Sequence, residues 1–99
     1  MINKVIMQDK KECFLCGANG ASDPLDRHHI FGGANRNKSE KYGLVVYLCH
    51  SRCHEFGENA AHRNRETMEY IRRRGQEEAM KQLGWKRSEF IREFGRNYI

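Results

Sequence analysis

The sequence predicts a small α+β protein, a β-hairpin stapled by a metal site and followed by helices. Two observations predict this class: all four cysteines and all five histidines lie between Cys13 and His62, and apolar residues adopt helical spacing only after that segment. The length of 99 residues allows one domain with a modest core, which a structural metal commonly stabilises. We therefore expect a single domain over residues 1–99, with a metal-stapled core at 11–63 and a helical extension at 64–99.

The N-terminal segment contains one short apolar run, Val5-Ile6-Met7, which fits either an edge strand or an irregular start. Met1-Ile2-Asn3-Lys4 leads to no apolar run of the length that a signal peptide needs. No stretch of the sequence approaches the length needed to span a membrane. We therefore expect a protein of a reducing, cytoplasmic compartment, with no membrane contact.

The four cysteines form two closely spaced pairs. Cys13 and Cys16 are three residues apart, so one tight turn directs both sulfurs to one point, and Gly17 supplies the left-handed backbone that such turns often need. Cys49 and Cys53 are four residues apart and complete a set of four thiolates, which zinc accepts in a closed tetrahedral site. A reducing compartment favours structural zinc over the alternatives, which are disulfides or buried free thiols.

Two short strands are expected between the cysteine pairs. Turn-forming residues at 18–25 predict a loop, and 26–31 is a short strand candidate. Residues 43–49 form the best strand of the chain, because they are β-branched, aromatic and apolar. The polar and basic segment 35–41 predicts an exposed loop between the strands. The resulting hairpin should bring the neighbouring histidines of the first strand and Cys49 to one end.

Adjacent histidines occupy the first expected strand. Side chains next to each other on a strand point to opposite faces, so we expect His28 and His29 to divide their roles: one binds metal, and the other stays free to accept a proton near neutral pH. A surface or core role is the alternative for the pair taken alone. The flanking cysteine pairs and His54 favour a functional site. His50 is a candidate to replace one sulfur of the cysteine site.

Helical signals begin at Asn64, a suitable N-cap, with Glu66 in the first turn. Gly75 weakens this helix by roughly 1 kcal/mol relative to alanine, and Gly84 ends it. The apolar residues near one face indicate core packing; they are Met68, Ile71, Ala79, Met80 and Leu83.

A shorter helix is expected over 89–94, capped by Ser88 and ended by Gly95. Trp85 and Tyr98 are expected to pack the two helices together.

The net charge of +5 and the pI near 9.2 favour a polyanionic partner, although basic proteins without nucleic-acid roles are common. Most of the basic excess lies after residue 62. Arg36, Lys38 and Lys41 fall beside the histidine pair, which predicts that they contact nucleic-acid phosphates. The run at 72–74 fits a solvated charged face as well as it fits phosphate contact.

The cysteine and histidine motifs together resemble those of a known family. Cys13-x-x-Cys16, Asp26-x-His28-His29-Ile30 and Leu48-Cys49-x-x-x-Cys53-His54 are similar to the HNH endonucleases with a zinc-stapled ββα-metal (His-Me finger) core. The resemblance covers about residues 11–63 and is greatest to small phage and prophage members, in which Phe-Gly-Gly follows the histidine pair as at 31–33. It implies that His28 and His54 bind a catalytic ion and that His29 is the general base.

Two positions depart from the family pattern. The middle asparagine of the family is absent near Gly43, and Asn35 or Asn37 is the candidate to brace the loop that carries the base. The last histidine of many HNH sites falls at Glu58 here, so His62 reaches the ion only if the intervening segment is looped.

The resemblance implies metal-dependent hydrolysis of phosphodiester bonds in double-stranded DNA. The ligands of the catalytic ion would be His28, His54 and His62, beside the separate structural zinc. Imidazole ligands suit zinc, manganese or nickel, whereas magnesium prefers oxygen. Asp26 is either an acceptor that orients an imidazole or a turn residue. The family also implies a bacterial or phage-infected cell and a protein partner in a phage DNA-processing or recombination complex. The alternative is a non-catalytic zinc-stapled module that binds DNA or protein.

Overall fold

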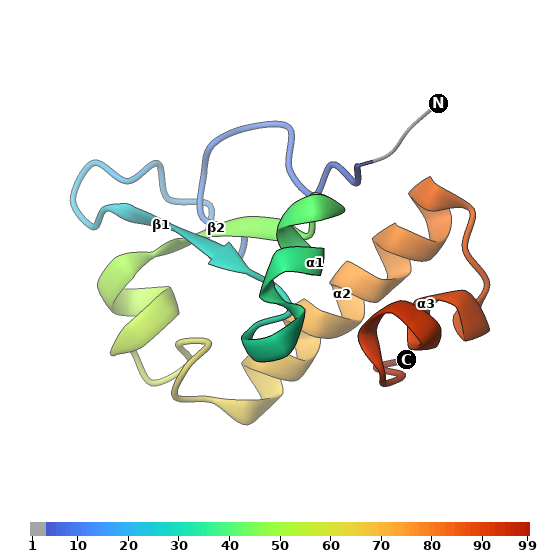
Figure 1. The fold of residues 1–99 in the computed structure, drawn as a ribbon. Coiled ribbons are helices and arrows are strands. Elements are labelled where there is room, and N and C mark those ends of the chain that lie inside the picture. Colours follow the sequence, from blue (N-terminus) through green and yellow to red (C-terminus); the bar gives the residue numbers. More distant parts are fainter. Residues whose placement is uncertain (1–3) are drawn as a thin grey trace.

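The computed structural model describes residues 4–99. Residues 1–3, which begin the segment predicted to lack a signal peptide, lie outside the described residues. The predicted α+β class is confirmed: two antiparallel strands are joined to helices in the order β1, η1, α1, β2, η2, α2, α3 (Figure 1). Within residues 4–99, no helix combines the length and apolar character needed to cross a membrane.

The two strands form the predicted hairpin, but the neighbouring histidines and Cys49 lie at opposite ends of it and not at one end as predicted, because His29 ends the first strand and therefore pairs with the start of the second. Strand β1 (Leu25–His29) pairs with β2 (Val45–Cys49), with Leu25 opposite Cys49 and His29 opposite Val45. Alternation along β2 buries Val46 and Leu48 against the helices, and it leaves Val45 and Tyr47 half-buried on the other face. His28 is buried with the inner set, whereas Arg27 and His29 belong to the outer face. The expected division of the two histidines between faces is therefore present.

The connection between the strands differs from the prediction. Residues 35–41 were expected to be an exposed loop, but they continue a 3-10 turn, η1 (Gly33–Asn35), into the helix α1 (Arg36–Lys41). Ser39, the buried residue of α1, accepts a hydrogen bond from Phe31 N at 3.2 Å and donates one to Leu44 O at 2.5 Å. The prediction was wrong because tertiary contacts stabilise so short a helix, whatever its polar composition.

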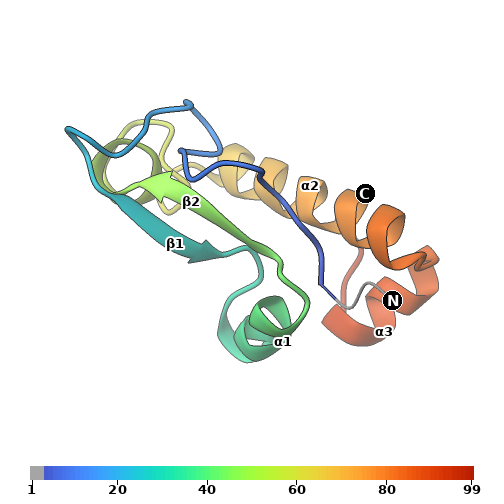
Figure 2. The same cartoon turned by 90° about the horizontal axis from the view of Figure 1, so that it is seen from above.

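The long helix α2 (Arg65–Leu83) begins and ends where predicted. The side chain of Asn64 accepts a hydrogen bond from Thr67 N at 3.0 Å, and Gly84 ends the helix with a φ of 70°. In Figures 1 and 2 the helix runs along one side of the hairpin, and α1 lies beyond the far end of the strands.

Gly75 lies in the middle of α2, where glycine would ordinarily weaken a helix. A Cβ atom at this position would approach Ile30 Cγ2 at 2.9 Å and Phe31 Cε2 at 3.3 Å. Glycine therefore lets α2 pack closely against the residues that follow β1. This packing places the buried face of the histidine strand beside the helix.

Gly75→Ala tests that contact. Helix propensity alone would stabilise the variant by about 1 kcal/mol, but overpacking against Ile30 should reverse the sign and destabilise it by about 1–3 kcal/mol. Thermal or urea unfolding measures the difference. Gly84→Ala is not a fair control because of its positive φ, so the comparison is Lys81→Ala, at an exposed site of the same helix. A more stable Gly75→Ala protein would contradict the close approach.

Helix α3 (Arg87–Phe94) begins two residues before the predicted start and is capped at Lys86 rather than Ser88. Glu89 accepts a hydrogen bond from Lys86 N at 3.1 Å, which stabilises the earlier start. Tyr98 packs on Phe31 and Phe90, with ring centroids 5.2 and 6.3 Å away, and its backbone N–H donates to Gln76 Oε1 at 2.6 Å. As predicted, Tyr98 joins the two helices.

Trp85 packs mainly on Tyr42, with ring centroids 4.9 Å apart, and more distantly on Phe90 at 6.5 Å. It therefore joins the helical part to the end of α1 as well as to α3.

Candidate metal centres

The first cysteine pair lies on a tight turn that is tied to β2. Gly17 N donates to Cys13 O at 2.8 Å, Cys13 N donates to Ala18 O at 2.8 Å, and Gly17 has a φ of 77°. Phe14 N donates to Tyr47 O at 2.8 Å. This turn presents both sulfurs to the end of the hairpin, as the spacing predicts.

The second pair comes from the end of β2 and from the short helix η2 (His50–Glu55) that follows it. Phe56 N donates to Ser51 O at 2.8 Å, which is the wide hydrogen-bond spacing of a π-type turn. Cys49 and Cys53 are both buried. The wide turn accommodates the four-residue spacing and directs both sulfurs toward the first pair.

All four sulfur atoms lie within 4.8 Å of one another, and Cys16 Sγ is 3.5 Å from Cys49 Sγ. A tetrahedral zinc ion with bonds of about 2.3 Å needs sulfurs about 3.8 Å apart. The group therefore fits a structural metal such as zinc. His50 does not join it, because its Nδ1 lies 2.6 Å from Asp26 Oδ2.

Arg52 was not among the predicted site residues, yet its Nη2 lies 3.3 Å from Cys16 Sγ and 3.6 Å from Cys49 Sγ. Burial raises the pKa of Cys49 to about 11 and that of Cys53 to about 12. At Cys16 burial acts in the same sense, but hydrogen bonds from the Ala18 backbone and Arg52 outweigh it and lower the pKa to about 6. Metal binding must therefore displace protons from the buried thiols.

A second group consists of three histidines on the inner side of β1. His28, His54 and His62 each offer a ring nitrogen within 4.8 Å of the other two, and Nε2 of His54 lies 3.1 Å from Nε2 of His62. The Nε2 atom of His28 is buried and has no hydrogen-bond partner among residues 4–99. Burial, followed by the nearby His54 and His62, lowers the pKa of His28 to about 3. A neutral, unpartnered imidazole nitrogen is the form that binds a cation.

Asp26 orients one member of this group. Its Oδ2 atom accepts a hydrogen bond from His54 Nδ1 at 2.8 Å and another from His50 Nδ1 at 2.6 Å. Because a carboxylate only accepts, Nδ1 of His54 carries the proton and Nε2 keeps its lone pair for a metal. Burial acts to raise the pKa of Asp26, but the two imidazole bonds outweigh it and hold the pKa below its usual range.

His62 reaches the group because the segment before it is looped. Ala61 N donates to Cys53 O at 2.7 Å, and His62 N donates to His54 O at 3.1 Å. Gly57 makes this possible, because a Cβ atom there would collide with the carbonyl oxygen of Arg52. The segment between Glu58 and His62 is therefore looped, which is the condition under which His62 was expected to reach the ion.

His29 lies on the opposite face of β1 from His28, His54 and His62, which we call the histidine triad. Its Nε2 atom is 3.0 Å from Glu40 Oε1, and Glu40 also receives two hydrogen bonds from Arg27. These bonds, from Arg27 first and then from His29, lower the pKa of Glu40 to about 2. Glu40 is thus a carboxylate fixed between an arginine and the histidine that was predicted to be the base.

The histidine triad and His29 line one cavity of about 350 Å³, which we call the histidine cavity. Arg36 and Arg72 also line it, and the buried Nε of Arg72 has no hydrogen-bond partner in the described part of the chain. The sequence left Arg72 undecided; its signal was its position one helical turn after Met68, which lines the same cavity.

The other predicted phosphate-binding residues do not line the histidine cavity. Lys38 Nζ donates to Glu93 O at 2.6 Å, and exposed Lys41 lies over the Tyr42 ring at 5.2 Å. Asn35 donates to Phe94 O at 3.0 Å, so it ties η1 to α3. Asn37 is exposed. Ser39 makes two further bonds that brace the loop after β1, and the role expected of Asn35 or Asn37 stays a prediction.

No protein-family model, curated protein or solved structure matches this chain. The structure itself shows a small ββα-like arrangement with a four-cysteine group that can hold a metal ion.

Proposed function

We propose that this protein is a metal-dependent endonuclease of the HNH type that hydrolyses phosphodiester bonds in double-stranded DNA. The observation that carries the proposal is the convergence of three imidazole nitrogens in the cavity that is also lined by His29 and three arginines. Side chains suited to acid-base chemistry, metal ligation and phosphate binding occur together there, which supports hydrolysis of a phosphodiester.

His28, His54 and His62 would hold the catalytic ion. They fit a divalent cation because His28 is neutral and its Nε2 atom has no partner within residues 4–99, and because the bond to Asp26 places the proton of a neutral His54 on Nδ1 and not on Nε2. A bound zinc, manganese, nickel or magnesium ion would stabilise the negative charge that develops on phosphate oxygens. Two cavity-lining arginines, Arg36 and Arg72, would position the phosphate group by charge-assisted hydrogen bonds.

His29 would accept the proton of the attacking water. Its side chain is 17% exposed and lines the cavity. A neutral imidazole that donates Nε2–H to Glu40 keeps its lone pair on Nδ1, so Nδ1 is the proton acceptor in this proposal. Glu40 would hold the ring in one orientation, and Arg27 would keep that carboxylate ionised.

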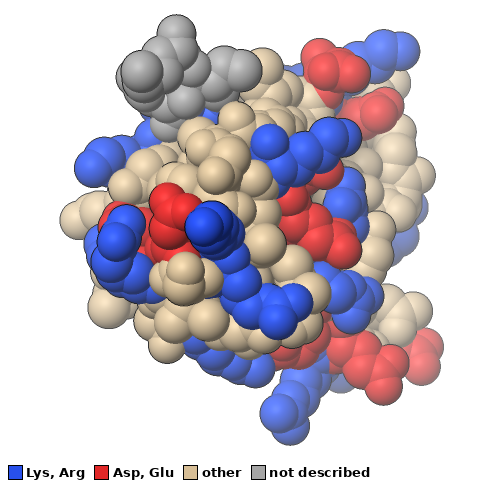
Figure 3. Space-filling view, turned by 90° about the vertical axis from the view of Figure 1, so that its right-hand side faces the viewer, with Lys and Arg blue, Asp and Glu red and all other residues tan. Residues whose placement is uncertain are grey.

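The arrangement of surface charge limits where DNA would bind. On the face seen in Figure 3, Lys and Arg side chains are interspersed with Asp and Glu. Arg74, for example, pairs with Glu77 at 2.8 Å and with Glu78 at 3.1 Å. Some basic side chains of the C-terminal part are therefore paired with carboxylates, which favours the arginines of the histidine cavity as the principal phosphate contacts. A protein partner in a phage DNA-processing complex, in the cytoplasm of a bacterial or phage-infected cell, remains part of the proposal.

A non-catalytic zinc-stapled module that binds DNA or protein is the second candidate. The contact between His29 Nε2 and Glu40 favours it, because that nitrogen is not available to water in this arrangement.

Incubation of supercoiled plasmid with the zinc-loaded protein distinguishes the two functions. Zinc, manganese, nickel and magnesium should be added in separate reactions. The endonuclease proposal predicts open-circular or linear plasmid with at least one of these ions. Intact plasmid with all four, together with retarded plasmid in a native gel, would support the binding module instead.

Arg72→Gln tests the phosphate contact. We expect kcat for plasmid cleavage to fall about 10- to 100-fold, because a charged donor to the phosphate is removed. Arg73→Gln, an exposed neighbour on the same helix, is the matched control and should cleave like the wild type. Equal thermal unfolding midpoints for the two variants would confirm intact folds. Equal cleavage rates would contradict the role given to Arg72.

A further inference from the structure

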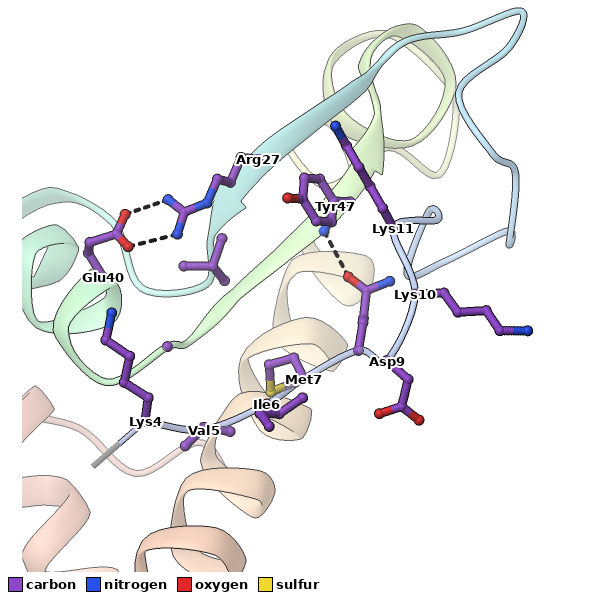
Figure 4. A pocket seen from close by; sticks show the side chains of 13 residues that line it. Lys4, Val5, Ile6, Met7, Asp9, Lys10, Lys11, Arg27, Glu40 and Tyr47 are labelled. Atoms are coloured by element: carbon purple, nitrogen blue, oxygen red, sulfur yellow. Dashed lines mark hydrogen bonds and ion pairs between the residues drawn. The ribbon is translucent and has the colours of Figure 1, made fainter. Parts of the chain in front are cut away.

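A second hollow lies on the outer face of the hairpin (Figure 4). It has a volume of about 400 Å³ and lies between the N-terminal segment 4–11 and the outer residues Arg27, Val45 and Tyr47. We call it the outer groove. Its N-terminal wall is held in place, because Val5 N donates to Tyr42 O at 2.7 Å and Tyr47 N donates to Gln8 Oε1 at 2.9 Å.

The outer groove carries a positive excess beside an aromatic ring. Its basic residues are Lys4, Lys10, Lys11 and Arg27, against the acidic residues Asp9 and Glu40. Arg27 already neutralises Glu40 through two hydrogen bonds, which leaves three lysines against Asp9. The Lys11 Nζ atom lies 5.4 Å from the centroid of the half-buried Tyr47 ring, and Figure 4 shows the two side chains next to each other.

The outer groove is linked to the histidine cavity. Arg27 lines both hollows, and Glu40 contacts both Arg27 and His29. A polyanionic chain that leaves the histidine cavity past Arg27 therefore enters the groove between Lys4 and Tyr47. Continuity through a shared arginine distinguishes this surface from an isolated basic patch.

Cations beside an accessible aromatic ring match one ligand chemistry. Single-stranded nucleic acid binds along positive grooves in which bases stack on aromatic side chains, whereas paired bases offer no free face. We propose that the outer groove holds an unpaired segment of the DNA strand whose phosphodiester lies in the histidine cavity. Lys4 and Lys11 would contact its phosphates, and a base would stack on Tyr47 in the place over the ring that Lys11 Nζ occupies without DNA.

This inference rests on the proposed function in one respect, namely that the strand in the groove is also the strand to be cleaved. Binding in the groove itself is measurable without cleavage. The inference predicts that DNA in which a duplex adjoins an unpaired segment, such as a fork or a frayed terminus, is bound in preference to fully paired DNA. A blunt duplex would fill the histidine cavity alone.

Fluorescence anisotropy with labelled oligonucleotides tests the inference. The protein is the zinc-loaded full chain carrying His29→Ala, so that bound DNA stays intact. The probes are an oligothymidylate, a blunt duplex and a forked duplex that contains the same duplex. We expect the fork to bind at least about tenfold more tightly than the blunt duplex.

Variants locate the binding. In the same background, Lys4→Glu with Lys11→Glu should weaken oligothymidylate binding at least about tenfold and reduce its salt dependence. Tyr47→Ala should weaken it about tenfold, and Tyr47→Phe, which keeps the ring, should bind like its parent. Lys81→Glu with Arg87→Glu is the control, since it makes the same charge change at exposed positions outside the groove.

Equal affinity for fork and blunt duplex, or equal weakening by the groove and control charge reversals, would overturn the inference. So would a polyglutamate peptide that displaces the oligothymidylate from the groove as well as unlabelled DNA does. The outcome is separate from that of the proposed function. Plasmid cleavage without the expected binding results would support the proposed function and contradict the inference about the groove. The expected binding results without plasmid cleavage would support the inference and contradict the proposed function.

Discussion

Cys49→Ser is expected to abolish zinc binding and to unfold the hairpin. Cys49 is fully buried at the end of β2, where it joins the strand to the cysteine group. Apparent binding free energies of structural zinc in small domains are about 10–16 kcal/mol, whereas whole domains are stable by only about 5–15 kcal/mol. Loss of the ion should therefore remove most of the stability, because the zinc contribution is as large as the stability of a whole domain.

Elemental analysis and circular dichroism measure these two effects. Ser51→Ala is the matched control, because it changes an exposed side chain of the same turn without touching a thiolate. The control should retain zinc and melt like the wild type. A wild-type protein without zinc, or a Cys49→Ser protein with an unchanged melting temperature, would contradict the metal staple.

His29→Ala is expected to reduce plasmid cleavage by about 10²- to 10⁴-fold while leaving metal content and DNA affinity nearly unchanged. The reason is that the substitution removes the proton acceptor but none of the three imidazoles that would hold the ion. His28→Ala should lose cleavage and the catalytic ion together, because it removes a ligand. Both variants should retain the structural zinc, whose ligands are thiolates.

His50→Ala is the control for this pair of variants. It also removes an imidazole near Asp26, but His50 is 48% exposed and does not line the histidine cavity. Its effect on the cleavage rate should be much smaller. Undiminished cleavage by His29→Ala would contradict the assignment of His29 as the base. Retention of the catalytic ion by His28→Ala would contradict the assignment of His28 as a ligand.

The sequence predicted best those features that are set by local spacing. Two residues between Cys13 and Cys16, followed by Gly17, specify a turn almost independently of the rest of the chain. The N-cap at Asn64 and the glycine at 84 likewise mark the two ends of α2 by local hydrogen bonding and backbone conformation.

Features that depend on tertiary contacts were not predictable in this way. The short helix α1 is stabilised by Ser39 and by bonds to α3, and its polar sequence is equally compatible with a loop. Glu40 approaches His29 only because α1 folds back toward the end of β1. Arg52 reaches the thiolates only because η2 is a wide turn, and the sequence of residues 50–55 contains no pattern that predicts such a turn.

The most direct test of the central claim is the rate of plasmid cleavage as the zinc-loaded protein is titrated with a second divalent ion. The imidazole triad predicts a rate that rises from near zero and levels off when one further ion is bound per chain, with the thiolate zinc unchanged. Manganese or nickel serves as the titrant, and bound metal is counted in the same samples. A rate that does not depend on the second ion, or no cleavage at full occupancy, would contradict the account.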